Sequence, residues 1–132
     1  MKQFRKLAVE LAQAAYSKKC RDIVILDVKK LTALCDYFII ATVNSQVQMK
    51  TVRESIDTCC SEKGMRPINS RSVSPSWQVL DYVGIVIHLM TPPTREFYRL
   101  ERLWHRAKTV NWNDKKRTAK RTKKKTGSRK RA

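Results

Sequence analysis

Two short and almost uninterrupted apolar runs constrain the fold of this 132-residue chain more than any other feature. They read I-V-I-L-D-V at 23–28 and D-Y-F-I-I-A-T at 36–42, and β-branched residues are frequent in both. Each run is shorter than a typical helix, and neither alternates apolar with polar residues as a half-exposed strand does. Both are therefore predicted to be strands covered on both faces, so the sheet that contains them needs helices packed against it.

Helices are predicted on either side of this strand pair. Apolar residues at helical spacing, with charged residues between them, predict an amphipathic helix over 2–18. Ser45 and Gln48 form an S-x-x-Q capping box that starts a second helix, and Gly64 stands where a left-handed residue would end it. The double proline of T-P-P-T begins a third helix, which we expect to run to Trp104.

Three further strands complete the predicted sheet. Residues 65–68 form a weak strand, and the polar segment 69–76 is predicted to be an exposed loop. Residues 77–82 and 85–90 form a tight hairpin around a Val-Gly turn. The element order is αββαβββα, which predicts a single α/β domain with a mixed five-stranded sheet and packed helices.

Positive charge is concentrated at the C-terminal end. The chain has 29 Lys and Arg against 11 Asp and Glu, a formal net charge of +18, and residues 115–132 hold eleven of these cations and no acid. This stretch also lacks Val, Ile, Leu, Phe and Trp, so it cannot bury enough apolar surface to offset the entropy of ordering. We therefore predict a folded domain at 1–110 and a disordered Lys/Arg-rich tail at 111–132.

The cations of the tail are predicted to bind RNA. Neutralising phosphates releases counterions, which gives an affinity that depends on salt and not on base sequence. The tail has no interleaved aromatic residues to stack on bases, so sequence-specific reading is not expected. The alternative is a solubilising extension without a ligand. The predicted RNA-binding residues are Lys115, Lys116, Arg117, Lys120, Arg121, Lys123, Lys124, Lys125, Arg129, Lys130 and Arg131.

The sequence argues against a catalytic or metal-binding centre. None of the three glycines belongs to a phosphate-binding loop before a helix. His88 and His105 lack partners at metal-ligand spacing, and the four cysteines contain no C-x-x-C pair. Asp22, Asp27 and Asp36 lie near strand ends, where a metal-dependent nucleotidyltransferase would hold its carboxylates, but edge or capping roles are favoured. We expect no enzymatic activity, no cofactor and no metal.

A group of aromatic and Met residues is a candidate protein-binding surface. Trp77 begins a strand directly after a polar segment, and Met90, Phe97 and Tyr98 cluster around the end of the adjoining strand. Charged residues stand beside them, and this composition is typical of a protein–protein hot spot. The alternative is that these residues only close the core under the last helix.

Six sequence blocks recur in the order and spacing of one known family. They are D-I-V-I-L-D-V (22–28), D-Y-F-I-I-A-T (36–42), N-S (44–45), W-Q-V-L-D-Y (77–82), I-V-I-H-L-M (85–90) and R-E-F-Y-R-L-E-R-L-W (95–104). Over residues 3–107 the chain resembles the ribosomal silencing factor family, also called Iojap-related proteins. Two turns depart from the family pattern: Val43 replaces the glycine of A-T-G-N-S, and Val83 and Gly84 replace the last two residues of D-Y-G-D.

The resemblance implies a non-catalytic translation factor whose fold is like that of nucleotidyltransferases without their catalytic set. It also implies binding to the large ribosomal subunit through universal large-subunit protein fourteen, on the face that meets the small subunit, so that subunit joining is blocked. Carried over to this chain, the protein-binding residues are Trp77, His88, Met90, Arg95, Glu96 and Tyr98.

The remaining expectations concern the state and place of the protein. We expect a cytoplasmic protein without a membrane segment, present as a monomer or weak homodimer. The alternative function is that of a general RNA-binding or ribosome-assembly protein that acts mainly through its basic tail.

Overall fold

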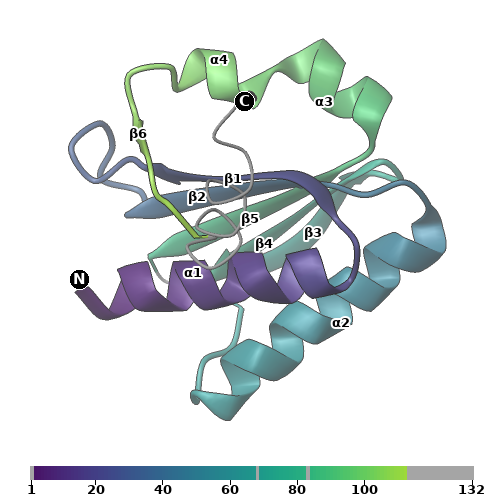
Figure 1. Ribbon diagram of the computed structural model, residues 1–132, viewed down its shortest axis with the longest axis horizontal. Coiled ribbons are helices and arrows are strands. Elements are labelled where there is room, and N and C mark those ends of the chain that lie inside the picture. Colours follow the sequence, from purple (N-terminus) through teal and green to yellow (C-terminus); the bar gives the residue numbers. More distant parts are fainter. Residues whose placement is uncertain (1, 68, 83, 113–132) are drawn as a thin grey trace, which may run out of the picture.

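A single mixed sheet between two layers of helices forms the domain (Figure 1). The computed structural model describes residues 2–67, 69–82 and 84–112. The strand order is β3-β4-β5-β2-β1-β6; β2 and β5 run parallel, and the other neighbours are antiparallel. The predicted α/β class and mixed sheet are therefore confirmed. The strands are β1 (Arg21–Asp27), β2 (Tyr37–Thr42), β3 (Asn69–Ser74), β4 (Trp77–Tyr82), β5 (Ile85–Met90) and β6 (Lys108–Thr109).

The two apolar runs occupy the centre of the sheet, as predicted. All six residues of β2 are buried, and β2 lies between β1 and β5. On one face, α1 (Lys2–Ser17) and α2 (Gln46–Glu62) cover a core that includes Leu11, Ile39 and Ile56. On the other face, α3 (Pro92–Tyr98) and α4 (Leu100–Leu103) lie over a smaller cluster that includes Phe38 and Met90. Figure 1 shows the two pairs of helices on opposite sides of the strands.

The predicted caps of the second helix are confirmed. The Ser45 hydroxyl accepts a hydrogen bond from the backbone N–H of Gln48 at 3.0 Å, which satisfies one free donor at the start of α2. The Gln48 side-chain oxygen in turn accepts the N–H of Asn44 at 2.6 Å. At the other end, Gly64 adopts a left-handed φ of 75° directly after Lys63. Local sequence rules therefore fix both ends of this helix.

The third strand lies four residues later than predicted. The strand prediction at 65–68 and the loop prediction at 69–76 are both wrong, because Asn69–Ser74 forms β3. This strand pairs only with β4, so it is an edge strand of the sheet. An edge strand can form from polar residues because its stability comes largely from backbone pairing with one neighbour. Only the short turn at Pro75 and Ser76 separates it from β4.

The predicted last helix is divided in two. Arg99 has a left-handed φ of 46°, ends α3 and begins α4, which turns the chain between the two helices. A non-glycine residue rarely adopts this conformation, and the sequence carries no glycine that would mark the break.

The chain after α4 crosses the edge of β1 and reaches α1. The two residues of β6 pair with Leu26 and Asp27, and the N–H of Val110 donates to the carbonyl of Ile25 at 2.9 Å. Trp112 then donates its indole N–H to the carbonyl of Ile23 at 3.0 Å. These contacts tie the C-terminal segment to the sheet up to residue 112. The predicted tail cations, from Lys115 to Arg131, lie outside the described residues.

Candidate functional site

Four aromatic side chains form a continuous row on the face of the sheet that α3 and α4 only partly cover. We call this set the aromatic face: Trp77, His88, Phe97 and Tyr98. Ring centroids are separated by 4.9 Å for Phe97 and Tyr98, 4.7 Å for Tyr98 and Trp77, and 6.0 Å for Trp77 and His88. Strand register explains the last pair, because Trp77 on β4 and His88 on β5 project to the same side of the sheet. The predicted cluster is therefore a real spatial group.

A hydrogen bond holds the two sheet residues of the aromatic face in place. The indole N–H of Trp77 donates to Nδ1 of His88 at 3.1 Å, which requires that Nδ1 carries no proton. The edge of the Phe38 ring meets the other side of His88 at 5.4 Å, and Phe38 in turn contacts Trp104 at 5.0 Å. The row of rings therefore continues from the surface into the core below α4, so the indole is supported on a rigid base.

The outer part of the aromatic face is open to solvent. Phe97 is 78% exposed and Tyr98 is 48% exposed, whereas Trp77 and His88 are half-buried. Large exposed rings on a fixed support are characteristic of protein-binding surfaces. Phe97 was not among the residues carried over from the family, although its place beside Tyr98 in R-E-F-Y was the available signal.

Met90 is wrong as a contact residue. Its side chain is fully buried in the cluster below α3 and α4. It pairs directly with Trp77 across β4 and β5, so both residues face the same side of the sheet. Met90 lies beneath the helical layer and Trp77 at its margin, and this difference decides which of the two a partner could reach.

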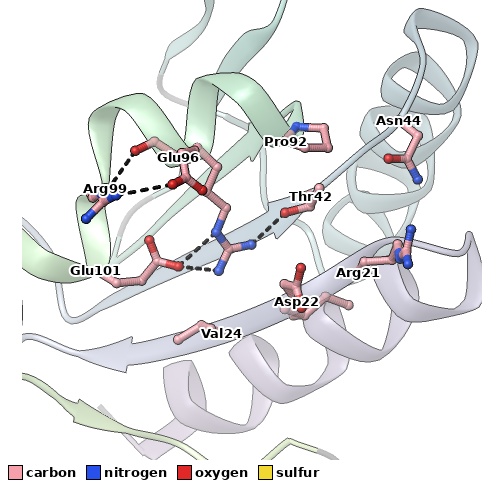
Figure 2. A pocket seen from close by; sticks show the side chains of 11 residues that line it. Arg21, Asp22, Val24, Thr42, Asn44, Pro92, Glu96, Arg99 and Glu101 are labelled. Carbon is pink, nitrogen blue, oxygen red and sulfur yellow. Dashed lines mark hydrogen bonds and ion pairs between the residues drawn. The ribbon is translucent and has the colours of Figure 1, made fainter. Parts of the chain in front are cut away.

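Arg95 connects the helices to the sheet. Its guanidinium is 11% exposed, and Nη1 donates to the Thr42 hydroxyl on β2 at 2.8 Å. Nε donates to the Glu101 carboxylate on α4 at 2.8 Å, and Nη2 forms an ion pair with the same carboxylate. The dashed lines that reach Thr42 and Glu101 in Figure 2 mark these contacts. Arg95 therefore supports the aromatic face from inside, whereas its neighbour Glu96 is exposed and pairs with Arg99 at 3.1 Å.

A cleft of about 680 Å³ lies beside this support, between the ends of β1 and β2 and the helices α3 and α4 (Figure 2). Three arginines and three carboxylates line it, so their formal charges cancel. These six residues are Arg21, Asp22, Arg95, Glu96, Arg99 and Glu101. The adjacent start of α2 already uses its backbone donors in the Ser45 cap. The cleft therefore offers little net attraction to a nucleotide phosphate.

The acidic residues considered for metal binding are separated in the structure. Asp22 and Asp27 stand near opposite ends of β1, and Asp22 lines the cleft. Partial burial disfavours the charge of Asp27, but hydrogen bonds and charge from Lys29 hold the pKa of Asp27 below its usual value. In the part of the chain that the structure describes, no three His, Cys, Asp or Glu side chains form a group that could hold a metal ion.

The cysteines are packing residues, as predicted. Cys20, Cys35 and Cys60 are buried, and burial raises the pKa of each thiol to about 11. These three thiols are therefore protonated and unreactive near neutral pH. No described helix is both long and apolar enough to cross a membrane.

Comparison with known proteins bears on the resemblance noted in the sequence. A family model described as "Ribosomal silencing factor during starvation" matches residues 1–132. The chain belongs to this family. The ribosomal silencing factor RsfS of Chromobacterium violaceum is 34% identical over 105 residues, which cover 79% of this chain and 84% of that protein. The chloroplastic protein Iojap of Arabidopsis thaliana is 37% identical over 103 residues, but these cover 78% of this chain and only 43% of that protein.

Solved structures of similar sequence share the silencing factor fold. A crystal structure of protein CV0518 from Chromobacterium violaceum superposes with a TM-score of 0.71 at 34% identity, covering 80% of this chain and 86% of that chain. A crystal structure of a protein from Bacillus halodurans gives a TM-score of 0.68 at 26% identity, covering 84% and 99%. The family assignment made from the sequence blocks is thus confirmed.

Proposed function

We propose that this chain binds the large ribosomal subunit and blocks its joining with the small subunit, so that translation is silenced. The observation that carries the proposal is the aromatic face, a solvent-exposed row of rings fixed on the sheet. Two of the family's sequence blocks, 77–82 and 95–104, contribute Trp77, Phe97 and Tyr98 to it. The partner that the family resemblance implies is universal large-subunit protein fourteen, at the face that meets the small subunit.

The aromatic face has the chemistry of an interface centre with a polar rim. Tyr98 and Trp77 offer flat apolar area, and the exposed pair of Glu96 and Arg99 provides charge beside it. Aromatic residues that become fully desolvated on binding often contribute 2 kcal/mol or more each. Because Trp77 and His88 are already held by their hydrogen bond, little side-chain entropy is lost when a partner covers them.

Occupancy alone is sufficient for the proposed mechanism. A domain of this length is about 30 Å across, since its radius of gyration is about 13 Å. A body of that size on the joining face keeps the two subunits apart, and no chemical step is needed. On this basis the protein is a regulatory factor of translation, acting in the cytoplasm, and not an enzyme.

The tail provides a second proposed attachment. Its eleven cations from Lys115 to Arg131 would neutralise ribosomal RNA phosphates and tether the docked domain. A role in subunit assembly is the second candidate function. It is favoured by a mouse relative named "Mitochondrial assembly of ribosomal large subunit protein 1", which is 30% identical over 92 residues covering 66% of this chain and 40% of that protein.

Cosedimentation with isolated subunits tests the proposal. The chain should sediment with large subunits and not with small ones, and an excess should reduce the formation of joined ribosomes. Phe97→Ala and Trp77→Ala should each weaken large-subunit binding about thirtyfold, which corresponds to about 2 kcal/mol. Val47→Ala is the matched control, because Val47 is an equally exposed apolar residue on α2. Unchanged binding of both aromatic variants would refute the assignment of this surface.

A further inference from the structure

Four exposed cations follow the edge of the sheet next to β6. We call this set the cationic edge: Lys30 in the loop after β1, and Arg102, Arg106 and Lys108 on the segment from α4 to β6. None of the four forms an ion pair with any residue in the described ranges. Their charges are therefore available to a ligand.

The loop and the C-terminal segment lie next to one another. Lys108 pairs with Asp27 across β6 and β1, and Ala107 packs on the same cluster as Val28. Figure 1 shows the loop between β1 and β2 beside the chain that descends from α4 to β6. The cations of the edge therefore come from two segments that are distant in sequence but adjacent in space.

The nearby carboxylates are already engaged. Between residues 99 and 112 the only acid is Glu101, whose carboxylate is bound by Arg95. Asp27 pairs with Lys29 at 3.1 Å, and the loop at 28–35 contains no acid. The cationic edge thus presents like charges without a neutralising partner, in contrast to the charge-balanced cleft on the other side of α4.

The backbone below these cations is held at both ends. Trp104 packs against Phe38 with ring centroids 5.0 Å apart, and the N–H of Val110 donates to Ile25 at 2.9 Å. Cations on a fixed backbone lose less conformational entropy on binding than cations on a free chain. The edge is therefore suited to a defined position on a polyanion.

We propose that the cationic edge docks on the phosphate backbone of RNA. A run of unpaired like charges without base-reading side chains matches a repeating polyanion better than a protein surface, where both signs alternate. The inference rests on the proposed function for the source of the RNA, because the large subunit supplies both RNA and protein. It differs from the tail proposal because every residue of the edge belongs to the folded domain.

The sheet order also gives the distance between the two attachments. Four strand spacings of about 4.8 Å separate β4, which carries Trp77, from β6, which carries Lys108, or about 19 Å. The RNA phosphates that meet the edge should therefore lie on the order of 20 Å from the protein bound at the aromatic face.

The test compares two full-length variants of equal charge. The edge variant carries Arg102→Gln, Arg106→Gln and Lys108→Gln, and the control variant carries Lys18→Gln, Lys50→Gln and Arg66→Gln. The control cations are equally exposed but lie on α2 and on the segments that follow α1 and α2, on the other side of the sheet. Binding to a 20-base-pair RNA duplex and to large subunits is measured between 50 and 200 mM salt. Because all six side chains are exposed, both variants should melt like the parent.

We expect the edge variant to show a shallower salt dependence. Each lost phosphate contact lowers the log–log slope by about 0.9, so three contacts reduce the affinity loss across this fourfold salt range by about 40-fold. Slopes for the edge and control variants that agree with each other would overturn the inference. So would an edge variant that loses binding to phosphatidylserine vesicles or to RNA-free ribosomal protein while its duplex slope equals that of the control.

A third variant separates this inference from the proposed function. Trp77→Ala should lose large-subunit binding and keep the duplex slope of the parent chain. If Trp77→Ala binds subunits normally, the proposed protein contact fails, and the duplex slopes still decide whether the edge binds RNA.

Discussion

Replacing Arg95 with methionine separates support of the aromatic face from direct contact with a partner. Methionine keeps most of the apolar stem but removes the donors to Thr42 and Glu101. Thr42 is 4% exposed, so the loss of its donor should cost about 1–2 kcal/mol. The Glu101 carboxylate is 37% exposed, so the lost ion pair adds only about 1 kcal/mol after solvent screening.

The expected total is therefore about 2–3 kcal/mol of lost stability. For a domain of this length that lowers the melting temperature by about 8–12 °C, since each kcal/mol shifts it by about 4 °C. Thermal unfolding followed by circular dichroism measures the effect. Large-subunit binding should fall as well, because α3 loses its connection to β2 and α4.

A double-mutant cycle with Glu101→Gln decides how Arg95 acts. If the two residues work as one support, their effects on stability are non-additive by about 1 kcal/mol. Glu101→Gln should then also weaken subunit binding, although Glu101 is not in the aromatic face. An Arg95→Met protein that melts like the parent chain yet binds subunits poorly would refute this reasoning and return Arg95 to the contact surface.

Three other perturbations follow from the packing and the charge distribution. Gly84→Ala should destabilise the domain by about 2–3 kcal/mol in denaturant unfolding, because Gly84 has a φ of 86° and a new Cβ would lie 2.7 Å from the Phe4 ring. Gly64→Ala is the control with the same handedness and open space, so it should cost only about 1 kcal/mol, and equal losses would contradict the steric argument. Cys59→Ala with Cys60→Ala should leave subunit binding unchanged and cost about 1 kcal/mol; one zinc per parent chain, lost in this variant, would contradict the packing role. Truncation to 1–114 should flatten the salt dependence of subunit binding while large subunits are still preferred, and equal slopes would exclude tail contacts with RNA.

The parts of the fold that were predicted from the sequence are those set by local rules or by long apolar runs. The Ser45 cap and the left-handed Gly64 depend on a few neighbouring residues, and the segments 23–28 and 36–42 are buried wherever the rest of the chain packs. The edge strand β3 was misplaced because its pairing partner, and not its own composition, decides that it is a strand. Two-residue β6 depends equally on β1.

The burial of individual site residues depended on where the helices lie over the sheet. Trp77 and Met90 are paired neighbours with similar surroundings in the sequence, but only Met90 lies fully under the helical layer. The break at Arg99 sets that coverage, because it turns the chain from α3 into α4, and no residue pattern marks it. Likewise, Arg95 looked like a surface charge until the structure placed Thr42 and Glu101 within reach of it.

The arrangement of the sheet connects these observations to function. A single protein contact at the aromatic face would leave the domain free to pivot about the Trp77 side chain. A second contact at the cationic edge, about 19 Å away at the far end of the strand order, would remove that freedom. Two separated contacts also raise the effective concentration of each site once the other is bound. Because Arg95 connects α3 to both α4 and β2, the helices that carry Tyr98 and Arg102 cannot move independently. The domain would then meet the large subunit as one rigid body in one orientation, which is what blocking a joining surface by occupancy requires.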